Sequence, residues 1–392
     1  MAFRLLPFDY AARNAGRNWL RTVLTTGGAA AVIFLVILMG AFVQTLTSSL
    51  RATGDHNNAI VLGKGSEDFL EQSEIRADVP SILGASVESI VKREGVAMVS
   101  PEIVHAAVIR QTSAENPDTG NQRKGLVRGV TPMAFQLHSQ IYLKEGKLPG
   151  SGEAVAGKLA ATKLGLPESA LQPGQTIFFE GRAWTISGVF EAPGTTFEAE
   201  LWVPLEELKT QVKRETISCA VVRLKSPSDL TALQVFASSK LDLEITAVSE
   251  ARFYSSLASF FRPMQVMGWV MAALVAVAGL FGGLNTLIAV IVARGRELAC
   301  LETIGFSRRA IIVSLIQESL LMVGAGALIA AGLALLLLDG RGIRFVMGAL
   351  SLQVDALVLA VGFGTALLLA VGGTAIASLR LIRTPLIELL RS

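Results

Sequence analysis

Four long apolar runs constrain this chain more than any other feature of its sequence. They cover residues 23–46, 263–293, 310–338 and 356–379. Each run exceeds the roughly 20 residues that a helix needs to cross about 30 Å of hydrocarbon at 1.5 Å per residue. The third run contains a single charged residue, Glu318. We therefore expect four transmembrane helices. The first is expected to be an uncleaved anchor, because its apolar core is far longer than that of a signal peptide.

The basic residues near the ends of these runs predict the orientation of the chain. They gather before the first run, between the second and third runs and after the fourth run, at Arg4, Arg13, Arg17, Arg21, Arg294, Arg296, Arg308, Arg309, Arg380, Arg383 and Arg391. Because Lys and Arg concentrate in cytoplasmic segments of membrane proteins, we expect these three regions to be cytoplasmic. An amphipathic helix at 1–22, the connection at 294–309 and the tail at 380–392 then lie inside the cell. Residues 47–262 and a short loop at 339–355 lie outside it.

Residues 47–262 alternate between strand-like and helix-like patterns, as an ordinary soluble domain does. Strand patterns at 58–65 and 97–111 flank a helix pattern over 80–95 that ends at Gly95. We expect a large extracytoplasmic α+β domain of two lobes, inserted between transmembrane helices 1 and 2. One lobe is built from residues 55–125 and 215–250, and the other from residues 126–214.

Composition and motifs argue against two kinds of binding. Only 17% of the residues are charged and the net charge is +3, which excludes a strongly basic protein that binds nucleic acid. Gly152, Gly157 and Lys158 nearly match the phosphate-binding loop G-x-x-x-x-G-K-[ST]. However, Leu159 stands where a hydroxyl would hold Mg²⁺. We therefore expect no nucleotide site there and, since no complete Walker motif is present, no ATPase domain in this chain.

The histidines and cysteines form no pattern typical of a metal or catalytic site. His56, His105 and His138 have no ligand partner three or four residues away, so we expect no metal site. The predicted topology places Cys219 and Cys300 on opposite sides of the membrane, so they cannot pair within one chain. We also find no paired histidine and nucleophile. We expect no catalytic residue and no bound cofactor in this chain.

The transmembrane segments contain few polar groups, which argues against a hydrophilic channel. We expect Glu318 to lie near the inner interface or to face another helix, because an unpaired carboxylate in lipid is costly. Gly279 and Gly283 form a G-x-x-x-G pattern, which permits two helices to approach closely. This pattern fits packing within one chain and a dimer interface equally well.

The connection at 294–309 is rich in charges of both signs. Leu298, Leu301 and Ile304 fall on one side of a short helix, which predicts a helix on the membrane surface. Gly305 is expected to end this helix, and Ser307 to cap the third transmembrane helix. The residues alone fit a docking surface for a cytoplasmic protein and a solvated loop about equally well.

The same connection resembles the signature of MacB/FtsX-type ABC transporter permeases. Its matching residues are Arg296, Glu297 and Leu298, then Leu301 and Gly305, then the basic pair Arg308 and Arg309, and in the third span Glu318, Gly324 and Gly326. The resemblance extends to the N-terminal sequence YAARNAGRNWLRTVLT and to the C-terminal RTPLIELLR. It also covers the order of one span, a large external domain and three further spans.

The resemblance implies the permease subunit of an ABC transporter in the bacterial inner (plasma) membrane. Residues 294–309 would form the coupling helix on a separate cytoplasmic ATPase, which would bind ATP and Mg²⁺. The docking contacts would come from Arg294, Arg296, Glu297, Leu298, Leu301, Glu302, Gly305, Arg308 and Arg309. The lobe at 55–125 and 215–250 would be porter-like. The other partners would be membrane lipids and a second permease subunit, identical or different. A periplasmic adaptor protein is left open.

The functional class also stays open at this point. In one hypothesis, ATP hydrolysis moves the external domain by mechanotransmission, for the export, efflux or extraction of a peptide, drug, lipid or lipoprotein. In a second, the external domain regulates a cell-wall hydrolase, as in FtsX, and carries no cargo. In a third, the chain is a passive membrane-anchored binding domain.

Overall fold

The computed structural model describes residues 8–17, 19–111, 123–345 and 348–383 of the 392-residue chain. They belong to two compact units. The helical unit comprises residues 1–44, 263–341 and 352–392, and the sheet unit comprises residues 45–262 and 342–351. Residues 1–7 of the predicted N-terminal helix and 384–392 of the predicted tail lie outside the described residues.

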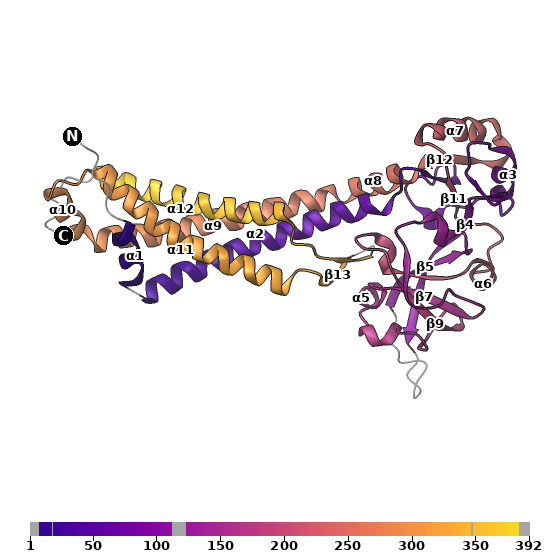
Figure 1. Cartoon of the computed structure of the whole chain (residues 1–392), viewed down its shortest axis with the longest axis horizontal. Coiled ribbons are helices and arrows are strands. Elements are labelled where there is room, and N and C mark those ends of the chain that lie inside the picture. The colour runs from indigo at the N-terminus through magenta and orange to yellow at the C-terminus, as the bar shows by residue number, and fades with distance from the viewer. Residues whose placement is uncertain (1–7, 18, 112–122, 346–347, 384–392) are drawn as a thin grey trace. The chain divides into compact units, whose positions relative to one another are not determined.

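Long helices dominate the helical unit. Its helices are α1 (Phe8–Arg17), α2 (Trp19–Thr53), α9 (Arg262–Ala293), α10 (Gly295–Thr303), α11 (Arg308–Leu337) and α12 (Ala356–Arg383) (Figure 1). In the described part of the chain, four of them, α2, α9, α11 and α12, are long and apolar enough to cross a membrane. The predicted span at 23–46 lies within α2, which continues to Thr53 because no glycine or proline follows Leu46 until Gly54. The last residues of α2 belong to the sheet unit.

Small residues let the helices of this unit approach one another closely. A Cβ atom on Gly326 of α11 would lie 2.7 Å from the carbonyl oxygen of Thr26 on α2. A Cβ atom on Gly279 of α9 would lie 2.8 Å from the side chain of Val32, also on α2. Among the described residues, no atom lies within 4 Å of that position on Gly283. The G-x-x-x-G pattern is therefore used within one chain at Gly279.

The sheet unit contains one large mixed sheet. Its strands are β1 (Asn58–Gly63), β4 (Val99–Gln111), β5 (Arg123–Val130), β6 (Tyr142–Gly146), β7 (Glu153–Gly157), β8 (Thr176–Phe179), β9 (Arg182–Glu191), β10 (Glu200–Pro204), β11 (Cys219–Arg223) and β12 (Ile245–Ser249). Their order is β12-β1-β11-β4-β5-β10-β7-β9-β6, and β8 pairs with both β4 and β9. Because of these two pairings, the described parts of β4, β5, β10, β7, β9 and β8 close into a small barrel. A domain with this α+β composition between the first and second long helices confirms the predicted fold class.

Strand β4 is shared between the two lobes of the sheet unit. Its start, Val99–Glu102, pairs with β11 in the first lobe, whereas Ile103–Ile109 pair with β5 in the barrel. The prediction placed residues 55–125 entirely in the first lobe, and the structure differs in this respect. The alternation of apolar residues shows that β4 is a strand, but it does not show where along the strand the partner changes.

Helices cover the sheet, and one of them is shorter than predicted. These helices are α3 (Val79–Ser86), α4 (Ala134–Leu137), α5 (Ala160–Leu164), α6 (Leu205–Gln211), α7 (Leu230–Ser239) and α8 (Glu250–Phe260). The helix predicted over 80–95 ends at Ser86. A hairpin of β2 (Lys92–Arg93) and β3 (Val96–Ala97) follows it. Glu94 and Gly95 both have positive φ, 53° and 82°. Gly95 therefore serves a tight hairpin turn rather than a helix end.

The short loop predicted at 339–355 contains a β-hairpin that belongs to the sheet unit. Strands β13 (Gly342–Phe345) and β14 (Gly348–Ser351) pair in antiparallel fashion. A Cβ atom on Gly342 would lie 3.0 Å from Thr162 of α5, and the Arg344 guanidinium lies directly against Gly165 at the end of α5. Ala349 is fully buried in a cluster with Leu159. This hairpin is thus packed on the barrel lobe.

Candidate functional site

The connection between α9 and α11 forms the short helix α10. Arg294 stands at its N-terminal cap, and α10 runs from Gly295 to Thr303. Gly305 has φ +103°, a conformation that L side chains rarely adopt, and the Ser307 hydroxyl accepts a hydrogen bond of 3.3 Å from the Ala310 amide. The predicted glycine stop and serine cap are both confirmed.

The apolar side of α10 is only partly the predicted one. Leu298 is 3% exposed and packs with Ile291, Leu315 and the half-buried Leu301. Ile304, which the sequence pattern placed on the same side, is 70% exposed. Ile304 is the C-terminal cap of α10, directly before Gly305, and its side chain does not follow the inner face.

A buried carboxylate lies beneath α10. The side chain of Glu318 on α11 is 6% exposed, and three groups from other segments contact it. The Arg21 guanidinium donates to Oε1 at 2.5 Å, and the Asn14 amide donates to Oε2 at 2.5 Å. The Arg294 guanidinium donates to Oε2 at 3.1 Å. Glu318 therefore joins α1, α2, α11 and the start of α10, as expected for a carboxylate that faces other helices.

Glu297 forms a second layer of the same cluster. Its carboxylate accepts from the Arg294 Nε at 3.1 Å and from the Tyr10 hydroxyl at 2.7 Å, and Arg17 lies at 3.6 Å. The hydrogen bond from Arg294 lowers the pKa of Glu297. Three guanidinium groups face two carboxylates across both layers. We refer to Tyr10, Asn14, Arg17, Arg21, Arg294, Glu297 and Glu318 as the inner charge cluster.

The predicted docking residues divide into two groups. Arg294, Glu297 and Leu298 point into the helical unit, and Arg308 pairs with Glu302 at 2.8 Å across the turn. The exposed positions on and next to α10 are Arg296, Cys300, Thr303, Ile304, Gly305, Ser307 and Arg309. Sequence reasoning missed Tyr10, Asn14 and Arg21 as partners of the cluster. The sequence indicated only that these three residues lie in the predicted amphipathic segment at 1–22, and not which residues they contact.

The sheet unit holds a second network of buried charges, at the junction of its lobes. Arg128 of β5 is 3% exposed and donates twice to Glu200, at 2.7 Å each, and once to Glu102 at 2.8 Å. The Trp202 indole also donates to Glu200 at 2.8 Å. This geometry satisfies the guanidinium and both carboxylates, which a buried ion pair requires.

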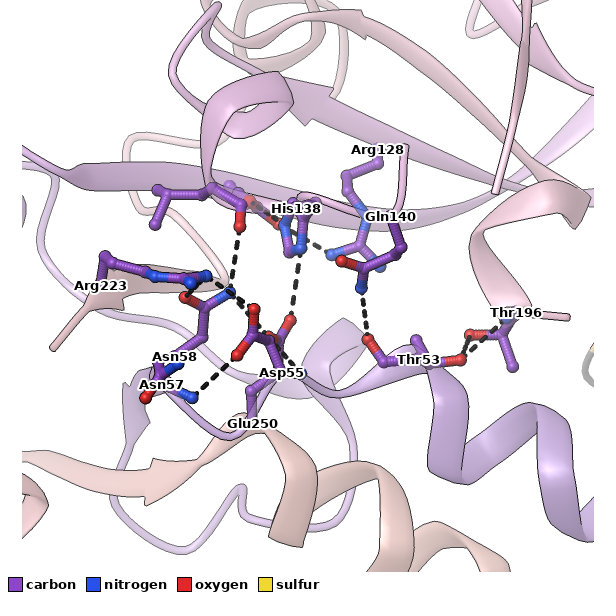
Figure 2. A network of polar contacts seen from close by, with 12 residues as sticks. Thr53, Asp55, Asn57, Asn58, Arg128, His138, Gln140, Thr196, Arg223 and Glu250 are labelled. Carbon is purple, nitrogen blue, oxygen red and sulfur yellow. Dashed lines mark hydrogen bonds and ion pairs between the residues drawn. The ribbon is translucent and has the colours of Figure 1, made fainter. Parts of the chain in front are cut away.

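His138 extends this network toward α8. Its ring lies 3.0 Å from Glu102. It also lies 3.3 Å from Glu250, the first residue of α8 (Figure 2). Burial alone would lower the pKa of His138, but the charge and hydrogen bond of Glu102, followed by Glu250, raise it to about 10. Burial would likewise raise the pKa of Glu102, but His138 and then Arg128 lower it to about 2. No acidic residue lies three or four positions from His138 in the sequence, so its ion pairs were not predictable from local spacing.

The network also reaches the ends of α2 and α8. The Thr53 hydroxyl at the end of α2 accepts from the Thr196 amide at 2.9 Å, and the Thr53 carbonyl accepts from Gln140 at 2.7 Å (Figure 2). Glu250 accepts from the Asn58 side chain at 2.9 Å. Both helix ends are therefore hydrogen-bonded to the body of the sheet unit.

The near-match to a phosphate-binding loop has a structural explanation. A Cβ atom on Gly157 would lie 2.4 Å from the carbonyl oxygen of Glu198, so glycine is needed there for close backbone packing. The Gly152 amide donates to Glu207 at 2.9 Å. Neither glycine is arranged to cradle a phosphate. Within the described residues, no group of three or more His, Cys, Asp or Glu could hold a metal ion.

Comparisons with known proteins cover most of the chain. A family model described as MacB-like periplasmic core domain matches residues 22–235, and one described as FtsX-like permease C-terminal matches residues 269–386. No curated protein sequence is a significant match.

Two solved structures are similar to part of the chain. The periplasmic region of MacB from Actinobacillus actinomycetemcomitans matches with 12% identity and a TM-score of 0.39, over 54% of this chain and 97% of that one. The extracellular domain of the noncanonic ABC-type transporter YknZ from Gram-positive bacteria matches with 12% identity and a TM-score of 0.37, over 49% and 100%.

Proposed function

This chain belongs to the ABC transporter permeases of MacB/FtsX type, a multi-pass membrane family with a periplasmic core domain, and we propose that it transmits force from a separate cytoplasmic ATPase to that domain. In this proposal both termini and α10 are cytoplasmic, and ATP and Mg²⁺ are bound by the partner ATPase. The match to an FtsX-like permease over residues 269–386 supports the role of a permease subunit that works with a separate ATPase.

The inner charge cluster is the observation that carries this proposal. It fixes the start of α10 to α11 through Glu318 and to α2 through Arg21. A displacement of α10 would therefore be passed to these two long helices instead of being absorbed by a loose loop. Because α2 is one uninterrupted helix from Trp19 to Thr53, the displacement would continue into the sheet unit.

Within this mechanism the docking residues take two roles. Exposed Arg296, Ile304 and Arg309 would contact the ATPase. Arg294 and Glu297 would position α10, since their side chains are engaged with α1 and α11. The work would be export or extraction of a hydrophobic or peptide cargo with a second permease subunit. The scarcity of polar residues in the long helices is consistent with cargo that is handled outside the membrane.

Purification of the tagged full chain from membranes of its own bacterium tests the docking role. We expect an ABC ATPase to copurify and to hydrolyse ATP. Reversal of two exposed charges, Arg296→Glu with Arg309→Glu, should lower both signals at least tenfold, because like charges at an interface are strongly unfavourable. The control is Arg51→Glu with Arg341→Glu, a matched pair of exposed arginines outside α10. Equal copurification by the two double variants would refute the docking role.

The orientation of α10 can be tested separately with the native cysteines. Cys300 on α10 is exposed, whereas Cys219 is fully buried. A membrane-impermeant maleimide should therefore label Cys300 only after spheroplasts are permeabilised. Labelling of Cys300 in intact spheroplasts would contradict the proposed topology. Copurification of a cell-wall hydrolase, without cargo or adaptor, would favour the FtsX-like signalling role over transport.

A further inference from the structure

The sheet unit contains a cavity that the proposed force transmission does not use. Its volume is about 100 Å³, and it is lined by residues of both lobes together with α8 and the end of α2. A cavity of this size accommodates one ring or a short alkyl chain rather than a whole drug-sized molecule. Its position between two lobes is a common one for ligand sites.

The walls of this cavity are apolar and largely aromatic. Phe253, Leu257 and Phe261 line it from α8 and the residue after it, and Leu50 lines it from α2. Tyr254 also lines it and is only 5% exposed. Among the described residues the Tyr254 hydroxyl has no hydrogen-bond partner. This hydroxyl is therefore available to a ligand or a water that enters the cavity.

The charged residues of the floor compensate one another. Arg128 and Glu200 line the cavity, but two hydrogen bonds of 2.7 Å join them. They contribute no net charge to a ligand. The lining also includes a second basic residue, Lys163 of α5.

The mouth adds carboxylates and aromatic rings. Asp68 and Glu71 line the cavity and are exposed, so the lining as a whole is negative by one charge. Phe69, which also lines it, is 42% exposed, and its ring lies 5.8 Å from that of the 52% exposed Phe260. Aromatic faces beside carboxylates are the usual environment for organic cations, including quaternary ammonium groups.

We propose that this cavity binds the apolar part of a cationic amphiphile, whose positive group is held at the mouth by Asp68, Glu71 and the ring of Phe69. The apolar part lies against Leu257 and Phe261, and a polar atom of the ligand or an entering water satisfies the Tyr254 hydroxyl. This proposal concerns the sheet unit alone and does not depend on the coupling to an ATPase.

Three probes of equal chain length test the proposal: hexyltrimethylammonium, 1-hexanol and hexyl sulfate. The full chain is placed in lipid nanodiscs, and binding is titrated by saturation-transfer NMR against empty nanodiscs. We expect saturable binding of hexyltrimethylammonium, at least threefold weaker binding of 1-hexanol, and the weakest binding of hexyl sulfate. Absence of saturable binding, or binding of hexyl sulfate as tight as that of the cation, would overturn the proposal.

Variants locate the binding. Leu257→Trp should fill the cavity and abolish saturable binding. Asp68→Asn with Glu71→Gln changes only exposed side chains and should weaken binding of the cation about fivefold, as expected for two exposed charges. Glu67→Gln with Glu74→Gln is the control, because these acids belong to the same exposed run and do not line the cavity. Binding that the first two variants leave unchanged would place the probe elsewhere and refute the proposed site.

Discussion

Replacement of Arg128 by methionine is the sharpest test of the buried network in the sheet unit. The guanidinium makes three charge-assisted hydrogen bonds of 2.7–2.8 Å. Its Cζ atom also lies 5.1 Å from the centre of the Phe197 ring. In the variant, Glu102 still has His138 as a polar partner, but the only side-chain partner left to Glu200 among the described residues is the Trp202 indole, which donates a hydrogen bond to it. Removal of one partner from a buried ion pair costs about 3–5 kcal/mol, because the remaining charge is uncompensated.

The expected loss for Arg128→Met is therefore about 4 kcal/mol. For a unit of this size, each kcal/mol lowers the melting temperature by roughly 2–4 °C, so we expect a decrease of about 8–16 °C. Intrinsic fluorescence of the full chain reports this transition, because Trp184 and Trp202 are fully buried in the core of the sheet unit.

Two further variants complete this experiment. The control is Arg76→Met, which removes an exposed ion pair with Asp78 and should leave the melting temperature close to that of the wild type. The triple variant Arg128→Met, Glu102→Gln and Glu200→Gln should recover part of the loss, since it removes the charge of Arg128 together with those of its two carboxylate partners and leaves His138 paired with Glu250. If Arg128→Met melted within about 2 °C of Arg76→Met, our account of the network would be wrong.

Two other predictions concern pH and helix packing. The folded pKa of His138 is raised to about 10, so its stabilisation is complete below its ordinary pKa of 6.5 and is lost as the pH rises to about 10. Thermal unfolding should show a fall of about 1.4 kcal/mol per pH unit across this range that is absent from His138→Gln; equal slopes would contradict it. Gly326→Leu should destabilise the helical unit by about 1–3 kcal/mol, as measured by thermal aggregation in detergent. Gly324→Leu, whose Cβ position has no neighbour within 4 Å among the described residues, should be close to wild type. Equal loss in both would refute the close packing of Gly326 on α2.

Local patterns in the sequence predict much of the helical unit. Long apolar runs give its four membrane helices, because burial in hydrocarbon leaves few other possibilities for such runs. Gly305 and Ser307 mark the end of α10 and the start of α11, since a positive φ and an N-terminal cap each depend on one residue. These features are encoded within a few residues of where they act.

Contacts between distant residues could not be predicted in this way. Glu318 was a candidate for a buried role, but its partners Asn14 and Arg21 lie 304 and 297 residues away. His138 likewise meets Glu102 and Glu250 only through the sheet topology. A single sequence contains no periodic signal for pairings of this kind, because they depend on which elements the fold brings together.

The hairpin of β13 and β14 changes how the sheet unit is attached. The chain enters this unit through α2 and leaves it through α8 and α9, but it returns between α11 and α12, where residues 342–351 are packed on α5. Each of the four long helices is therefore joined by a short covalent path to the same folded body. The chain thus crosses between the two units four times, at 44/45, 262/263, 341/342 and 351/352, so that cleavage of any one connection leaves three covalent links between them.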